Sequence, residues 1–203
     1  MKLSKLYLVT DSGLCKNLEA TVLEAVKGGA GIVQLREKSL CTRDFISEAR
    51  SLKKLLEPFG VPLIINDRVD VALASDADGV HLGQSDMPYA MARQLLGPGK
   101  IIGLSVENQA QVLEANALDV DYIGVSPVFD TSTKTDTAPA FGLEGLRKAV
   151  QTSRHPVVAI GGMNKTTAAN VWACGAESIA VVSAIMAADD PRRAAEELLH
   201  ELQ

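Results

Sequence analysis

Short apolar runs recur at intervals along this chain, and each is bounded by polar or glycine-containing segments. The runs are rich in Val, Ile and Leu on both faces, which is typical of strands buried within a parallel sheet. They cover residues 6–10, 31–35, 62–65, 79–82, 101–104, 122–125, 157–160 and 178–182. The pattern therefore predicts eight buried parallel strands.

Stretches with helical periodicity separate these runs, because apolar residues recur three and four positions apart. The stripes comprise Leu18, Val22, Ala25 and Val26; Phe45, Ala49, Leu52, Leu55 and Leu56; Val112, Leu113 and Leu118; Ala168, Val171 and Trp172; and Ala194, Ala195, Leu198 and Leu199. Eight alternations of strand and helix predict an α/β fold that closes into one barrel over residues 1–203. An open, doubly wound sheet is the alternative that this alternation leaves open.

Composition narrows the class of protein. The 203 residues are 47% hydrophobic and 22% charged, which is enough to bury a large core in one domain. The formal net charge of -5 argues against nucleic acid or an anionic membrane as a partner. The three cysteines are widely spaced and show no metal-binding pattern. No run approaches the roughly 20 apolar residues of a membrane span, so we expect a cytoplasmic protein, with a homo-oligomer left open.

Polar clusters follow five of the predicted strands. They are Gln34-Leu35-Arg36-Glu37-Lys38, Asn66-Asp67, Gln84-Ser85-Asp86, Ser105 and Thr131-Ser132-Thr133-Lys134. A parallel barrel gathers the carboxyl ends of its strands at one mouth, where active sites lie. Carboxylates, cations and hydroxyls converging there suit a magnesium-bound pyrophosphate, so the pattern predicts an enzyme.

Asp67 and Asp86 follow the third and fourth predicted strands. Adjacent strands lie about 4.8 Å apart, so two carboxylates at neighbouring tips can share one hard cation. Magnesium prefers oxygen ligands and commonly completes its shell with substrate phosphates. The alternative is that each aspartate caps the helix that follows it.

Gln34, Arg36 and Lys38 share one face of the second strand. Burying a cation inside a barrel costs free energy unless an anion lies beside it, and Arg can bind a phosphate through two hydrogen bonds. The alternative is an ion pair with Glu37 or with an aspartate of the mouth, although Glu37 alternates to the opposite face. We expect a phosphate ligand here.

A second anion site is predicted on the other side of the mouth. Gly161-Gly162 follows the seventh strand and Val182-Ser183 ends the eighth, a pair of loops that frequently binds phosphate in such barrels. The hydroxyls of residues 131–133 and the ammonium of Lys134 can also wrap a phosphate. A simple tight turn at Gly161-Gly162 is the alternative. Two anion sites indicate two phosphorylated substrates.

Several of these segments together resemble the thiamine-phosphate synthase family. The matching segments are QLREK at 34–38, IINDRVDVALA at 64–74, GVHLGQSD at 79–86, GLS at 103–105, DYIGVSPVFDTSTKTD at 121–136, VVAIGGM at 157–163 and IAVVSAI at 179–185. The resemblance implies a (β/α)₈ TIM barrel. It also implies a transferase that condenses 4-amino-2-methyl-5-(diphosphooxymethyl)pyrimidine with 4-methyl-5-(2-phosphooxyethyl)thiazole and releases pyrophosphate.

Site roles follow from the resemblance position by position. The pyrimidine diphosphate is expected to contact Gln34, Leu35, Arg36, Glu37, Lys38, Asn66, Ser105 and Lys134. Among these, Arg36, Lys38, Ser105 and Lys134 are expected to act in catalysis. Asp67 and Asp86 are expected to hold Mg²⁺. The thiazole phosphate is expected to contact Thr131, Ser132, Thr133, Gly162, Val182 and Ser183. The implied mechanism is dissociative, with pyrophosphate departing before the thiazole nitrogen attacks.

Two positions depart from the family pattern: Ser126 replaces a common glycine and Asp130 a common proline. A thiazole tautomerase-like isomerase is the nearest alternative, but such relatives use a histidine shortly after the Gly-x-Ser turn. Residues 103–108 contain no histidine. A non-catalytic sensor of thiamine precursors is the second alternative, and a full metal pair argues against it.

Overall fold

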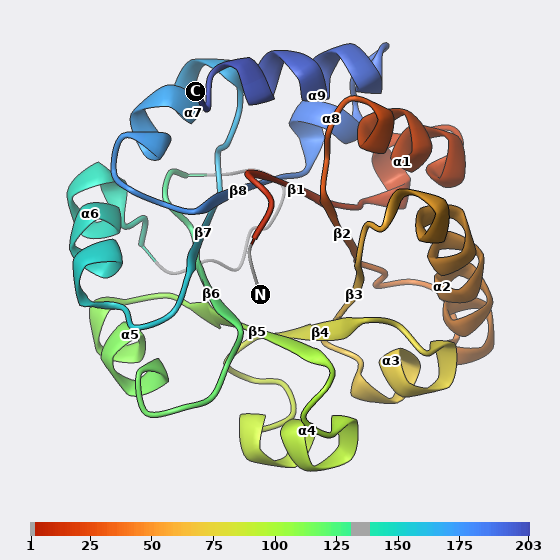
Figure 1. The fold of residues 1–203 in the computed structure, drawn as a ribbon, viewed down its shortest axis with the longest axis horizontal. Coiled ribbons are helices and arrows are strands. Elements are labelled where there is room, and N and C mark those ends of the chain that lie inside the picture. The colour runs from red at the N-terminus through yellow and green to blue at the C-terminus, as the bar shows by residue number, and fades with distance from the viewer. Residues whose placement is uncertain (1–2, 131–138) are drawn as a thin grey trace.

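Eight parallel strands close into a barrel in the computed structural model, which describes residues 3–130 and 139–203 (Figure 1). The strands are β1 (Leu6–Val9), β2 (Ile32–Leu35), β3 (Leu63–Asn66), β4 (Gly79–Leu82), β5 (Ile101–Val106), β6 (Tyr122–Val125), β7 (Val157–Ile160) and β8 (Ser178–Val181). Every strand pairs with its neighbour in chain order, and β8 returns to pair with β1. This closure confirms the predicted barrel and excludes the open sheet.

Helices cover the outside of the barrel in Figure 1, so that the outward-facing side chains of the strands are buried against them. They are α1 (Leu18–Lys27), α2 (Thr42–Leu56), α3 (Val69–Ser75), α4 (Tyr89–Leu96), α5 (Gln109–Ala115), α6 (Gly142–Thr152), α7 (Lys165–Trp172), α8 (Ser183–Met186) and α9 (Pro191–His200), with short 3₁₀ turns at Ser12–Leu14 and Glu57–Phe59. Each predicted strand matches an observed one to within two residues at either end. No helix of the described residues is long and apolar enough to cross a membrane.

Apolar side chains form two separate layers. The larger layer lies between strands and helices and includes Leu8, Leu35 and Val80. The smaller layer fills the barrel interior with Leu3, Tyr7, Val9, Ile32, Ile64, Tyr122, Val158 and Ala180. Residues 3–5 run across one end of the barrel, where Leu3 joins the interior layer (Figure 1). The interior is therefore packed at the amino end of the strands.

Aspartates that precede the strands serve the turns at the amino end. The Asp78 carboxylate accepts a hydrogen bond from the Leu63 N–H at 2.9 Å. Asp121 accepts one from the Ile102 N–H at 2.8 Å. Both contacts fix the entry of a strand into the barrel, so these carboxylates have a structural role.

Gly103 on β5 leaves room for the largest residue of the interior layer. A Cβ atom at this position would overlap the phenol ring of Tyr122. Tyr122 is only 1% exposed, and its hydroxyl is held by hydrogen bonds to Tyr7 and His81, so the ring cannot move aside without breaking these contacts. Close packing of the interior thus requires glycine at residue 103.

We expect Gly103→Ala to destabilise the protein by about 1–3 kcal/mol, the usual cost of overpacking a core. The free energy of unfolding, measured in urea, checks this value. Gly99→Ala is the matched control, because a Cβ at Gly99 meets no atom within 4 Å. Equal stability of the two variants would contradict the packing argument.

Candidate active site

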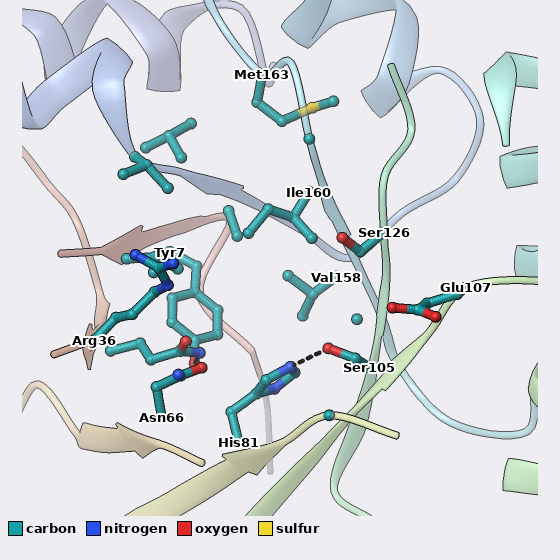
Figure 2. Close-up of a pocket in the computed structure, with 18 of the residues that line it drawn as sticks. Tyr7, Arg36, Asn66, His81, Ser105, Glu107, Ser126, Val158, Ile160 and Met163 are labelled. Atoms are coloured by element: carbon teal, nitrogen blue, oxygen red, sulfur yellow. Dashed lines mark hydrogen bonds between the residues drawn. The ribbon is translucent and has the colours of Figure 1, made fainter. Parts of the chain in front are cut away.

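A cavity of about 770 Å³ opens at the carboxyl ends of the strands (Figure 2). Most residues that the sequence assigned to a site line this one cavity: Gln34, Arg36, Lys38, Asn66, Asp67, Asp86, Ser105, Gly162, Val182 and Ser183. Residues distant in sequence therefore meet as predicted. Their individual roles stay predictions, since the geometry shows proximity and not binding.

Some assigned residues lie elsewhere. Leu35 is fully buried in the layer between strands and helices, and neither Leu35 nor Glu37 lines the cavity. Glu37 instead lies near Glu48, whose pKa is raised by burial and, to a smaller extent, by the negative charge of Glu37. A contact of the Leu35 or Glu37 side chain with substrate is thus not supported by the structure. Thr131, Ser132, Thr133 and Lys134 lie outside the described residues.

Asp67 is held at the tip of β3 by its backbone. Its φ angle of 63° lies in the left-handed region, which Asp tolerates better than most residues. Its N–H donates to the His81 carbonyl on β4 at 2.8 Å. The turn therefore fixes this carboxylate at the junction of the two strands.

Asp86 belongs to the turn after β4, where its Oδ2 accepts a hydrogen bond from the Gly83 N–H at 2.6 Å. Burial raises the pKa of Asp86, and the neighbouring Asp67 carboxyl raises it further, against the lowering effect of the Gly83 N–H. The two carboxylates therefore interact unfavourably when both are ionised, which is the arrangement that a bound cation relieves.

The helix-capping alternative is wrong for both aspartates. The residue at the N-cap of α3 is Arg68, and at α4 it is Pro88. Asp67 and Asp86 precede these positions, and both residues line the cavity. Their chemistry fits magnesium, because two carboxylates with room for phosphate oxygens are a common ligand set for that ion.

The two cations that follow β2 are each paired with an aspartate. Arg36 Nη1 lies 3.7 Å from Asp11 Oδ2, and Lys38 Nζ lies 2.5 Å from Asp67 Oδ2. The ion pair with an aspartate of the mouth, which the sequence left as an alternative, is therefore present. Both pairs are partly exposed, so they are weak enough for a phosphate to compete for the cations.

Glycines shape the opposite side of the cavity. Gly161 and Gly162 have φ angles of 103° and 69°, a conformation that side chains rarely adopt. A Cβ at Gly161 would lie 2.7 Å from the Pro127 Cβ. This loop and the start of α8 at Ser183 both line the cavity, so their backbone can approach a ligand closely.

Three residues of the cavity floor were not assigned from the sequence. Tyr7, His81 and Tyr122 project inward from β1, β4 and β6. Burial lowers the pKa of His81 to about 4, although the Asp67 charge opposes this shift, and burial raises the pKa of Tyr122. His81 is therefore neutral near pH 7. The sequence pattern that indicates these residues is a Tyr or His side chain at an inward-facing position of an otherwise apolar predicted strand.

Asp11 and Glu107 at the barrel mouth were also not singled out. Asp11 follows β1 and pairs with Arg36, while Glu107 follows β5 and lines the cavity beside Ser105 (Figure 2). Both obey the same rule that identified the five clusters, namely a polar residue just beyond a strand. Applying that rule to every strand would have included them.

Comparisons with known proteins agree with this arrangement. A family model described as thiamine monophosphate synthase matches residues 6–185. A thiamine-phosphate synthase of Vibrio parahaemolyticus is 54% identical over 200 residues, which cover 98% of each chain. A thiamine-phosphate synthase of Chloroflexus aurantiacus is 52% identical over 196 residues, covering 96% of this chain and 90% of the relative.

Solved structures show the same barrel. A thiamine phosphate pyrophosphorylase from Pyrococcus furiosus superposes with a TM-score of 0.90 at 44% identity, covering 98% of this chain and 95% of that one. A 3-hexulose-6-phosphate synthase shares the fold at a TM-score of 0.74 and 22% identity. By sequence and by structure, the chain belongs to the thiamine-phosphate synthase family, transferases of thiamine biosynthesis built on a TIM barrel.

Proposed function

We propose that this enzyme joins the pyrimidine diphosphate to the thiazole phosphate in the mouth cavity and releases pyrophosphate by a dissociative, magnesium-assisted mechanism. One observation carries this proposal: an acidic pair, two cations and a glycine loop line the same cavity. The acidic pair suits a metal–diphosphate complex, and the glycine loop suits a separate phosphate. The substrates are then two small anionic molecules.

The residues of β2 to β4 would bind the diphosphate. Arg36 and Lys38 offer positive charge from the segment that follows β2, and Asp67 and Asp86 would hold Mg²⁺. The metal would supply charge neutralisation to the departing pyrophosphate. Since Arg36 and Lys38 already pair with aspartates, substrate binding would exchange one anionic partner for another.

The thiazole phosphate would bind on the opposite side, at Gly162, Val182 and Ser183. Anchoring both substrates by their phosphates lets the enzyme hold the two reacting atoms together, which lowers the entropic part of the barrier. Apolar residues such as Val158 and Ile160 line the same cavity and limit the access of water to the reacting centre.

The two alternative functions differ in what they release. A tautomerase-like isomerase would convert a thiazole without using the diphosphate, and a sensor would bind both ligands without turnover. Mixing both substrates with Mg²⁺ and assaying thiamine phosphate and pyrophosphate separates the three cases. Formation of both products is expected, and saturable binding without pyrophosphate release would support the sensor.

We place the enzyme in the cytoplasm. Cys15, Cys41 and Cys174 are all free thiols in the structure, as expected in a reducing compartment.

The double variant Asp67→Asn with Asp86→Asn should lose Mg²⁺-dependent activity while it remains folded, because neutral amides bind Mg²⁺ poorly. Steady-state kinetics measure the loss of activity. Electron paramagnetic resonance of added Mn²⁺ measures the loss of metal binding. Asp76→Asn is the control. It is an exposed carboxylate at the opposite end of the barrel, with a φ of 54° that Asn also adopts. Wild-type turnover in the double variant would refute the metal role.

Lys38→Met should lower kcat by about 10²-fold, the scale of losing one charge that stabilises a developing anion. Lys27→Met is the control, since Lys27 lies on the surface of α1, where it pairs with Glu24, and does not line the cavity. A change confined to KM would reduce Lys38 to a binding residue. Lys134→Ala is expected to lower kcat by about the same factor, an expectation that comes from the family resemblance alone.

Ser183→Ala should raise KM for the thiazole phosphate and leave KM for the pyrimidine diphosphate unchanged, because only the thiazole phosphate is assigned to the start of α8. The pyrimidine diphosphate therefore serves as an internal control within the same variant. Loss of one hydrogen bond to a charged phosphate predicts an effect of roughly tenfold. An unchanged KM for the thiazole phosphate would count against this site.

A further inference from the structure

Five side chains form a continuous row of hydrogen bonds across the barrel interior. The Gln34 amide donates to the Tyr7 hydroxyl at 2.8 Å, and the Tyr7 and Tyr122 hydroxyls lie 2.8 Å apart. Tyr122 reaches His81 Nδ1 at 3.0 Å, and His81 Nε2 reaches Ser105 Oγ at 2.8 Å. Figure 2 shows the last contact as a dashed line. The row connects β2, β1, β6, β4 and β5, so no single segment of sequence contains it.

The direction of donation along the row is fixed by its first member. Gln34 Nε2 can only donate, so the Tyr7 oxygen accepts its hydrogen and the Tyr7 proton is directed to Tyr122. Tyr122 then donates to His81 Nδ1. A neutral imidazole that accepts at Nδ1 carries its hydrogen at Nε2, and this hydrogen is donated to Ser105 Oγ.

The last proton of the row belongs to Ser105. Its oxygen accepts from His81, so its own hydrogen is available for another acceptor. No acceptor for that hydrogen occurs among residues 3–130 and 139–203, and Ser105 lines the cavity. We propose that Tyr7 and Tyr122 are positioning residues that, through His81, make the Ser105 hydroxyl a hydrogen-bond donor to the departing diphosphate. This inference rests on the proposed function.

The opposite direction would be unfavourable for the same reaction. Ser105 would then donate to His81 and present only lone pairs to an anionic substrate. The hydroxyl hydrogens of Tyr7 and Tyr122 cannot reorient freely, because both residues are only 1% exposed. If the Tyr7 hydroxyl turned toward Gln34, two hydrogen-bond donors would face each other without an acceptor. The direction set at Gln34 is thus transmitted to Ser105, two side chains beyond the tyrosine pair along the row.

Packing holds the rings of the row in register. The Tyr7 and Tyr122 rings meet edge to face with centroids 5.9 Å apart, and the His81 and Tyr122 rings stack at 5.5 Å. A Cβ at Gly124 would lie 3.1 Å from His81 Cε1, so glycine there leaves space for the imidazole. The imidazole is therefore held between a phenol on one side and a serine on the other.

The test compares Tyr122→Phe with Tyr89→Phe. Both changes remove one phenol oxygen, but the Tyr89 hydroxyl donates to the Asp119 carbonyl outside the cavity. Tyr122→Phe should lower kcat about tenfold with little change in KM, since it frees His81 to accept from Ser105. Tyr89→Phe should retain the wild-type kcat. Tyr7→Phe should have a smaller effect, because Tyr122 can still donate to His81.

A double-mutant cycle distinguishes positioning from a general packing defect. In the Ser105→Ala background, Tyr122→Phe should cause no further loss of kcat, because the group that it positions is already absent. A loss as large as in the wild-type background would overturn the proposal. Urea unfolding of each variant confirms that the enzymes compared are folded.

Nitrogen-15 spectra of the imidazole test the row without any assay of activity. The folded wild-type enzyme should show neutral His81 with its hydrogen on Nε2 near pH 7. A hydrogen on Nδ1 would overturn the proposed direction, even in a fully active enzyme. Conversely, a wild-type enzyme that forms no thiamine phosphate but shows the Nε2–H form would refute the proposed function and leave the row intact.

Discussion

Pairing of β8 with β1 is the interaction on which the rest of the structure depends. This contact converts a row of strands into a closed barrel and turns alternate side chains of every strand toward one axis. Without closure, Arg36 on the β2 side and Ser183 after β8 would lie at opposite parts of an open sheet. With closure they line one cavity. The site is therefore a property of the ring of strands and of no single motif.

Charge is distributed unevenly over this ring. The chain is acidic overall, with a net charge of -5, yet Arg36 and Lys38 both line the mouth after β2, beside the carboxylates of Asp67 and Asp86. Arg36 and Lys38 remain there because Asp11 and Asp67 compensate them. Burial raises the pKa of Asp86, and the neighbouring Asp67 carboxyl raises it further, so a second negative charge beside Asp67 is unfavourable. A metal–diphosphate complex can satisfy both sets of charges together.

Below the mouth, polar groups are buried at a cost that the structure offsets with hydrogen bonds. Tyr7, Tyr122 and His81 would each be unfavourable in an apolar interior if their polar atoms had no partner. Each instead uses its polar atoms in the row from Gln34 to Ser105. Glycines on β5 and β6 provide the volume that these rings occupy. Polar partners and small residues are thus coupled features of the same interior.

The sequence by itself determined the strands, their order and most of the mouth, because apolar runs and the polar residues beyond them are local patterns. It also placed Asp67 and Asp86 just beyond two neighbouring strands, at the carboxyl end of the barrel. Only the tertiary structure decided which side chains meet. It excluded helix capping by Asp86, placed Leu35 outside the cavity and joined Tyr7, Tyr122 and His81 into one row. The physical reason is that such contacts depend on strand register and on the inward direction of each side chain, which are fixed only when the sheet closes.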